Sequence, residues 1–322
     1  MKHELKKNII TAALAYMEEH QLSNNDVVTK AGINSGYLSN MLRGNFETKV
    51  DNKMVPIGDK WFYKLSEVVG LDIKKRYIDA VATRQFTEII STLQDAKETG
   101  KSKMIIGFTG AGKTFAIDRF ENKYPTHTFR ITVSSLYKLV DLINELVDKL
   151  NIDLGSINAK RIFENSLKVR HDKVIEKIKD IKRNGGKPII ILDEGENMEI
   201  SLLKATKALF DGISDHCPIV IIGTEQLLNK LLNLKKRNRD AVPQLYRRFK
   251  AGRKDISPIT MTDKLDFIKP YVKDAGLQKL LCNLAENYGE LNDYLEPALR
   301  EADENDKVLN EEMFRIIYNM PK

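Results

Sequence analysis

The sequence is poor in cysteine and contains no long apolar run. Its two cysteines, Cys217 and Cys282, form no spacing that is typical of disulfide frameworks or zinc sites, so we expect reduced thiols and a cytoplasmic protein. No stretch approaches the roughly 20 apolar residues that a membrane helix needs. The first residues mix both charges and lack an apolar core, so we also expect no signal peptide.

A large excess of one charge is also absent. The 52 Lys and Arg residues against 45 Asp and Glu residues give a net charge of +7, which permits a polyanionic partner without requiring one. Hydrophobic residues make up 42% and charged residues 30%, as in ordinary globular proteins, and 322 residues suffice for two or three domains.

The first chemical signature is segment 107–114, which reads G-F-T-G-A-G-K-T. It lies between an apolar run at 103–106 and a helical pattern at 115–120, so the sequence predicts strand, glycine loop and helix. Such a loop turns backbone N–H groups towards phosphates, Lys113 can reach the β- and γ-phosphates, and the Thr114 hydroxyl can ligate Mg²⁺. The signature predicts ATP and Mg²⁺ as cofactors. The predicted nucleotide-binding residues are Gly107, Thr109, Gly110, Ala111, Gly112, Lys113, Thr114 and Phe115.

A second signature follows the apolar run 188–192, which predicts a strand buried on both faces. Asp193 and Glu194 come directly after this run, where parallel α/β sheets place their sites. We interpret Asp193 as a second Mg²⁺ ligand, acting through water, and Glu194 as the base that orients or deprotonates the attacking water. The alternative is a strand that ends in a surface acidic turn, which the upstream phosphate loop disfavours.

A third buried strand at 218–222 leads to Thr224. A polar side chain at this strand end can touch the γ-phosphate or the attacking water, and we place Thr224 among the catalytic candidates with Lys113. The alternative is that Thr224 only caps the following helix.

A basic run occupies residues 235–254, where nine Lys or Arg residues face Asp240 alone. This excess suits phosphates of nucleic acid, of a neighbour's nucleotide, or both. The candidates for DNA contact are Lys235, Lys236, Arg237 and Arg239. Residues 244–249 are predicted to form a short helix that presents Arg247 and Arg248.

Residues 1–82 carry a different pattern, with predicted helices near 5–20, 23–31, 35–43 and 59–69 and a loop or ribbon at 46–58. Ser23 is the expected N-cap of the second helix, and Gly32 lies in the turn before the third. Together they resemble a lambda-repressor-like helix-turn-helix. The alternative is a bundle that docks a protein. The expected DNA-contacting residues are Asn34, Ser35, Tyr37, Asn40 and Arg43.

The order of these signatures over residues 83–320 resembles that of AAA+ ATPases. The resemblance implies a P-loop AAA+ core at 83–258, made of a parallel sheet flanked by helices, and a C-terminal helical lid at 259–322. The all-α helix-turn-helix domain at 1–82 precedes this core. The resemblance also implies that Arg248, with Arg247 as the alternate, is an arginine finger for the next subunit. Where such lids carry an Arg, this sequence has Asn292, with Arg300 as a weak substitute, which favours slow hydrolysis.

A helix-turn-helix before a compact ATPase core resembles the target-DNA ATPases of transposition, the family of transposition protein B of Mu-like phages. That resemblance implies an ATPase that forms a ring or filament of identical copies on double-stranded DNA and delivers the DNA to a transposase. Two alternatives remain open. One is a remodelling ATPase similar to helicase loaders, and the other is a transcription regulator in which the ATPase is a sensor.

Overall fold

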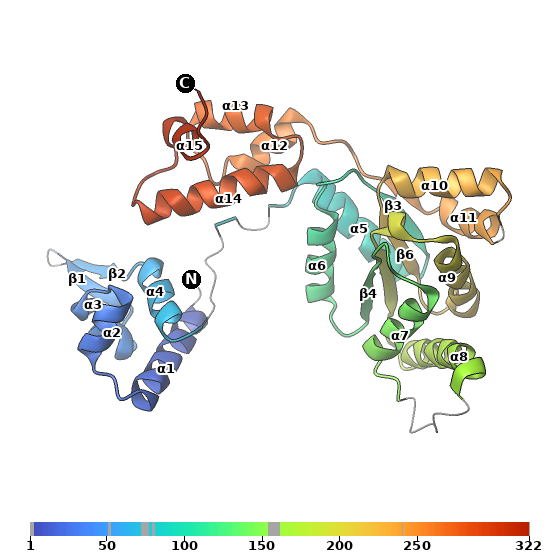
Figure 1. Cartoon of the computed structure of the whole chain (residues 1–322), viewed down its shortest axis with the longest axis horizontal. Coiled ribbons are helices and arrows are strands. Elements are labelled where there is room, and N and C mark those ends of the chain that lie inside the picture. The colour runs from blue at the N-terminus through green and yellow to red at the C-terminus, as the bar shows by residue number, and fades with distance from the viewer. Residues whose placement is uncertain are drawn as a thin grey trace. The chain divides into compact units, whose positions relative to one another are not determined.

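The computed structural model describes residues 3–50, 53–71, 77–78, 81–153, 162–239 and 241–321. The chain divides into two compact units, Met1–Asp79 and Ala80–Lys322, and each is described by itself (Figure 1). No helix in the described ranges is both long enough and apolar enough to cross a membrane.

The first unit packs four helices around one small core. They are α1 (His3–Glu19), α2 (Asn24–Ala31), α3 (Ser35–Leu42) and α4 (Asp59–Val68). Ser23 is the N-cap of α2, as predicted, and it forms a capping box with Asp26. Gly32 ends α2 with φ of 58°, a left-handed conformation that glycine adopts without strain, and so turns the chain sharply into α3.

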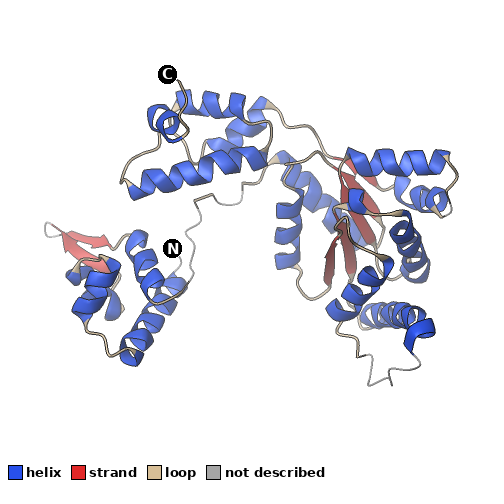
Figure 2. Ribbon diagram, in the orientation of Figure 1, coloured by secondary structure: helices blue, strands red, loops and turns tan. Residues whose placement is uncertain are grey.

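Segment 46–58 proves to be a ribbon. Strands β1 (Glu47–Val50) and β2 (Lys53–Pro56) pair antiparallel, and Figure 2 shows them beside the helices of this unit. The amide of Asn40 on α3 donates a hydrogen bond to the carbonyl of Glu47 over 3.2 Å, which ties the ribbon to that helix.

The second unit is built on a five-stranded, all-parallel sheet in the order β4-β5-β6-β3-β7. Its strands are β3 (Lys103–Ile106), β4 (Thr128–Thr132), β5 (Ile189–Asp193), β6 (Ile219–Gly223) and β7 (Arg253–Asp255). Apolar runs predicted β3, β5 and β6, and the alternating pattern at 127–133 predicts β4. No apolar pattern predicts β7, because its residues Arg-Lys-Asp are polar and it pairs on one side with β3 at the sheet edge.

Helices cover both faces of this sheet (Figures 1 and 2). On one face Ile189 and Ile191 pack with α5 (Arg84–Thr99) and α6 (Lys113–Lys123). On the other face Ile190 and Leu192 pack in a larger core. That core is covered by α7 (Leu139–Lys149), α8 (Ile162–Arg183), α9 (Ile200–Ile213), α10 (Glu225–Lys236) and α11 (Val242–Lys250). The alternation explains why β5 is apolar at every position before Asp193.

The apolar patterns at 136–150 and 159–183 predict two further helices of this unit. The helix expected from residue 136 begins at Leu139, because Lys138 is the N-cap and Asp141 closes that cap. Of the helix expected from residue 159, residues 159–161 lie outside the described ranges, and α8 begins at Ile162.

Four C-terminal helices form the lid, as predicted. They are α12 (Met261–Ile268), α13 (Ala275–Leu284), α14 (Tyr288–Glu304) and α15 (Glu311–Ile317). A buried amide joins the lid to the core. The Gln85 amide on α5 donates to the carbonyl of Pro258 over 3.2 Å and accepts from the Tyr288 hydroxyl over 2.7 Å. The fold is therefore the predicted α/β core with helical regions before and after it.

Candidate active site

The loop between β3 and α6 has the backbone shape of an anion cradle. Gly110 and Gly112 have φ of 77° and 78°, where a side chain would strain the backbone, and Gly112 is the N-cap of α6. The first N–H groups of α6 therefore face the loop, together with the positive end of the helix dipole. This geometry suits a phosphate chain.

Lys113 lies at the centre of the loop and is 8% exposed. Its Nζ donates to the carbonyls of Gly107 and Phe108 over 3.0 and 2.9 Å. Burial lowers the pKa of Lys113 below its ordinary value, while the nearby carboxylates of Glu196, Glu194 and Asp193 act against that shift. The site thus holds a desolvated ammonium next to several carboxylates.

Asp193 ends β5 with both carboxylate oxygens engaged. Oδ1 accepts from the backbone N–H of Glu194 over 3.0 Å, and Oδ2 accepts from Nη2 of Arg130 on β4 over 2.8 Å. Arg130 also pairs with Asp118 on α6. Burial lowers the pKa of Arg130, but the hydrogen bonds with Asp193 and Asp118 outweigh burial and raise it above its ordinary value.

Sequence reasoning missed Arg130. The signal was available only after the sheet order was known. β4 pairs in parallel with β5, with Arg130 opposite Ile191, so the Arg130 side chain lies on the same sheet face as Asp193. Such a partner is recognised by two features. It is a basic residue on the strand that neighbours the one ending in Asp, and its side chain lies on the same sheet face as that Asp.

Glu194 has a left-handed backbone, with φ of 58° and ψ of 44°. For a residue other than glycine this costs about 1 kcal/mol or more, and such strain gathers at functional sites. Burial raises the pKa of Glu194 above its ordinary value, and the neighbouring charges of Glu196 and Asp193 add to the increase. A carboxyl of this kind can take up a proton more readily than an ordinary Glu.

Glu196 was also missed by sequence reasoning. Its Oε2 accepts from the backbone N–H of Thr224 over 3.2 Å, and its carbonyl accepts from Lys230 over 3.0 Å. Glu196 therefore holds the end of β5 against the end of β6. Between them Gly195 leaves no room for a side chain, because a Cβ there would lie 2.8 Å from Cγ2 of Ile221.

Thr224 occupies the N-cap position of α10, yet its side chain makes no capping hydrogen bond. Its Oγ1 is buried and has no hydrogen-bond partner among the described residues. A buried hydroxyl without a partner is costly unless a ligand or water satisfies it. The capping alternative accounts for the position of Thr224 at the start of α10, but it does not account for its unpartnered hydroxyl. That hydroxyl can form a hydrogen bond to a bound group.

The lid also contributes to the site. Asn287 is the N-cap of α14, and its Oδ1 accepts from the backbone N–H of Glu290 over 3.0 Å. A Cβ on Gly110 would collide with the Asn287 side chain, so the lid rests directly on the glycine loop. The sequence pointed to Asn292, in the second turn of α14, and gave no signal for Asn287. Arg300 pairs with Glu296, three turns into α14.

Arg248 on α11 is held within its own chain. It pairs with Asp211 on α9, and its guanidinium lies 4.7 Å from the centre of the Phe210 ring. Arg247 is exposed, and both arginines line a hollow of about 320 Å³ with Pro243 and Gln244. At the end of α10 the predicted DNA-contacting residues Lys235, Lys236, Arg237 and Arg239 are all exposed, whereas Asp240 lies outside the described residues.

In the first unit the predicted DNA-contacting residues have mixed surroundings. The side chain of Asn34 caps α3 by accepting from the N–H of Gly36 over 2.9 Å, and Asn40 bonds to the ribbon. The ring of Tyr37 packs against that of Trp61, with centroids 5.6 Å apart. Ser35 and Arg43 are exposed. Local structure thus occupies three of the five side chains.

The residues around the loop fit a magnesium ion that shares its ligands with a nucleotide. No group of three or more His, Cys, Asp or Glu side chains that could hold a metal occurs in the described part of the chain. Thr114 and Asp193 supply two hard oxygen ligands, and Mg²⁺ in nucleotide sites uses one or two protein ligands together with phosphates and water. The arrangement can therefore bind a nucleoside triphosphate and present a water to Glu194.

Arg130→Met tests the ion pair beneath this site. The substitution leaves Asp193, which is 1% exposed, without its cation, so we expect the free energy of unfolding to fall by about 3 kcal/mol. Urea denaturation measures this change. The control is Arg183→Met, because Arg183 pairs with Asp180 at the surface and should cost about 1 kcal/mol at most. Equal costs for the two variants would contradict the buried pair.

Part of the chain is similar to a known domain and to a named relative. Residues 96–231 match the model of the AAA domain, a range that includes the glycine loop, Asp193, Glu194 and Thr224. A relative, the Mu-like prophage FluMu DNA transposition protein B of Haemophilus influenzae, is 22% identical over 228 residues, which span 69% of this chain and 71% of that protein.

Two solved structures share the fold. The ORC1 protein of Aeropyrum pernix, in complex with DNA, superposes with a TM-score of 0.54 at 15% identity, over 76% of this chain and 67% of that one. Cdc6p of Pyrobaculum aerophilum superposes with a TM-score of 0.50 at 16% identity, over 73% of this chain and 66% of that one. At such identities the likeness concerns the fold alone.

Proposed function

We propose that this chain is an AAA+ ATPase similar to transposition protein B, and that it uses ATP to assemble on double-stranded DNA and deliver that DNA to a transposase. The ATPase part rests on one observation. The glycine loop, Asp193 and Glu194 all follow the C-terminal ends of parallel strands, and the charges of Asp193 and Glu194 act on Lys113. The transposase part is supported by the relative, whose name describes a DNA transposition protein. We propose the division 1–82, 83–258 and 259–322 for DNA contact, nucleotide binding and lid.

In this proposal the loop residues 107–115 hold the triphosphate of ATP. Lys113 turns from the carbonyls of Gly107 and Phe108 to the β- and γ-phosphates. Thr114 and Asp193 hold Mg²⁺, which when bound neutralises charge on the phosphates. Arg130 and the N–H of Glu194 fix the direction of the Asp193 carboxylate.

Glu194 orients the attacking water and accepts its proton, because it directly follows the end of β5 and its raised pKa favours proton uptake. The unpartnered hydroxyl of Thr224 hydrogen bonds to the γ-phosphate or to the same water. The side chain of Asn287 rests on Gly110, so a nucleotide bound in the glycine loop should shift Asn287 and with it the lid. This side chain is an amide, so it adds no positive charge, which favours slow hydrolysis.

Lys113→Ala tests nucleotide binding. Hydrogen bonds to charged groups are worth about 1.5–3 kcal/mol, so ATP affinity should fall by about 10- to 100-fold. Titration with a fluorescent ATP analogue measures it. Lys101→Ala is the control, because Lys101 is exposed ahead of β3 and should leave the affinity unchanged. If both variants bind like the parent, the loop is not the nucleotide site.

DNA contact is proposed for two surfaces. One is the exposed basic end of α10 with Lys235, Lys236, Arg237 and Arg239, and the other is α3, which we propose to be the second helix of a helix-turn-helix. Since three of the five α3 candidates are engaged in local structure, phosphate contacts by the basic residues dominate, and binding tolerates many sequences.

Salt dependence tests this DNA model. On duplex DNA, log K should fall with log salt at a slope of about −0.9 for each phosphate contact. Lys236→Ala should make that slope shallower by about one contact, and Lys279→Ala, an exposed lid lysine, should leave it unchanged. Fluorescence anisotropy over a range of salt measures both. A flat response, or a ~1,000-fold preference for one sequence, would contradict the model.

A further inference from the structure

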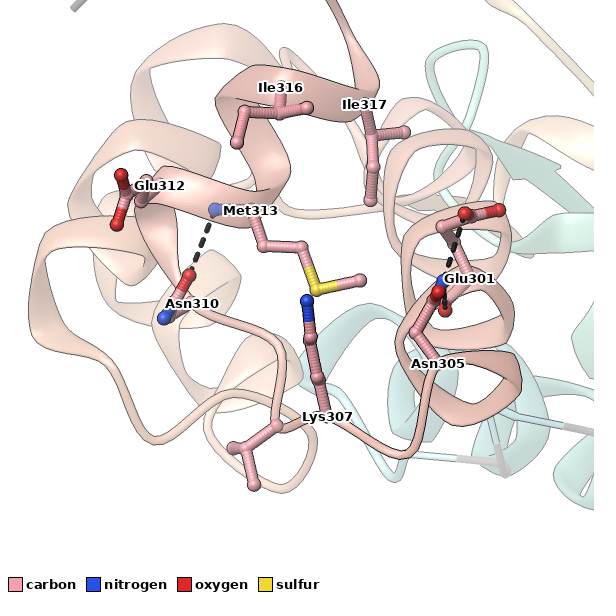
Figure 3. A pocket seen from close by; sticks show the side chains of 9 residues that line it. Glu301, Asn305, Lys307, Asn310, Glu312, Met313, Ile316 and Ile317 are labelled. Carbon is pink, nitrogen blue, oxygen red and sulfur yellow. Dashed lines mark hydrogen bonds between the residues drawn. The ribbon is translucent and has the colours of Figure 1, made fainter.

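The lid carries an open groove between the C-terminal end of α14 and α15, with a volume of about 530 Å³. Figure 3 shows Met313 in the middle of the groove, with Ile316 and Ile317 along one side. Val308 and Ile316 are 77% and 70% exposed. The groove thus gathers exposed apolar side chains from α15 and from the segment that precedes it.

The chain segment around the groove is acidic. Glu301, Glu312 and Lys307 line the groove itself, and residues 301–312 as a whole contain six acidic side chains and one basic side chain. Glu301 and Glu312 are exposed on opposite sides of Met313 (Figure 3). Acidic residues at the C-terminal end of α14 destabilise that helix, because helix C-termini favour cations. The last turn of α14 contains no basic residue that would offset this effect.

These features define the chemistry of an occupant. The excess of acidic side chains in residues 301–312 repels phosphates, which argues against a second DNA surface here. The occupant must present several cations on apolar stems that can cover Val308 and Ile316. Lys and Arg side chains do both, because their methylene stems lie on apolar surface while the charged ends reach a rim.

The chain itself offers such a segment at the end of α10. Lys235, Lys236, Arg237 and Arg239 are all exposed there. Figure 1 shows α10 and α11 at the end of the second unit that lies away from α14 and α15. Two different, complementary faces on one chain form a heterologous contact, which builds rings or filaments rather than closed pairs.

We propose that the acidic lid groove binds the basic end of α10 from a second copy of this chain. The inference rests on the proposed ability of the chain to assemble with ATP, and it concerns assembly in the absence of DNA. The same basic residues are candidates for DNA contact, so DNA competes with the neighbouring lid for them, and the contact is tested without DNA.

Charge reversal tests this contact. One variant reverses the groove, with Glu301→Lys and Glu312→Lys, and the other reverses the basic end, with Lys236→Glu and Arg237→Glu. In each variant like charges face one another between identical copies, so the protein concentration needed for assembly with ATP should rise by about tenfold or more. Light scattering without DNA measures assembly. Binding of a fluorescent ATP analogue shows that each variant is folded.

The two variants mixed in equal amounts should assemble near the parent concentration. In the mixture every junction can join opposite charges, because the reversed groove accepts the reversed end and the original groove accepts the original end. Asp266→Lys, an exposed reversal on α12, is the control and should assemble like the parent.

Single variants that assemble like the parent, or a mixture no better than its components, would overturn the contact. So would a parent that stays monomeric with ATP. The proposed ATP chemistry fails separately, through loss of nucleotide binding or hydrolysis in the parent, and both are measured on the same samples.

Discussion

Glu194→Gln should bind ATP like the parent protein and hydrolyse it at least ~100-fold more slowly, the lower range for loss of a general base. The amide has the shape of the carboxylate but cannot accept the proton of the attacking water. Binding should persist because the phosphate contacts come from the glycine loop and Lys113. Filter binding and phosphate release measure the two quantities. Glu199→Gln, at the exposed start of α9, is the matched control and should turn over normally.

The pH profile identifies the same residue. Glu194 must be deprotonated to accept a proton, and its pKa is raised by burial and by the charges of Glu196 and Asp193. Hydrolysis should therefore decline, as pH falls, at a higher pH than an ordinary Glu would give. Glu196→Gln removes one of those charges, so the acidic decline should move to lower pH. If Glu194→Gln hydrolyses ATP like the parent, another group is the base.

Arg248→Ala should cut hydrolysis by ~10³-fold and abolish assembly with ATP, because an arginine supplied by a neighbour stabilises the charge of phosphoryl transfer. ATP affinity of the single chain should stay nearly unchanged. The fold should survive, since Asp211 keeps a second partner in Lys207 over 3.0 Å. Arg247→Ala is the matched variant. If the larger loss occurs there, Arg247 rather than Arg248 reaches the neighbour's nucleotide.

Mixing distinguishes this role from DNA contact. Chains with Arg248→Ala keep Glu194, and chains with Glu194→Gln keep Arg248, so a mixture of the two should regain part of the hydrolysis that each lacks alone. If Arg248 contacts DNA instead, the Arg248→Ala substitution should weaken DNA binding modestly and leave DNA-free assembly intact. An Arg248→Ala protein that assembles and hydrolyses normally would remove the finger from the account.

Apolar patterning predicted much of the fold, because buried parallel strands need runs such as 188–192 and the helices need an apolar stripe. The failures have physical causes. β7 is polar because it is an edge strand, and α7 starts late because the Lys138 backbone and the Asp141 side chain make the cap. The pattern at 46–58 predicts either a loop or a ribbon without deciding between them, because exposed strands carry little apolar signal.

The site divides in the same way. Residues adjacent in sequence, such as the glycine loop and the Asp193–Glu194 pair, form signatures that can be found without a structure. Arg130, Glu196 and Asn287 come to the site from three separate segments, and only the strand order and the position of the lid bring them there. Pairwise contacts of this kind leave no local pattern in one sequence.

Electron microscopy of the protein on long duplex DNA tests the central claim, ATP-dependent assembly on DNA, most directly. With Mg²⁺ and ATP at a concentration that just saturates the parent, we expect continuous coverage of the DNA by repeating copies, longer-lived for Glu194→Gln and strongly reduced for Lys113→Ala. Without nucleotide it predicts bare or sparsely decorated DNA. Equal coverage with and without ATP, or undiminished coverage by Lys113→Ala, would contradict the account.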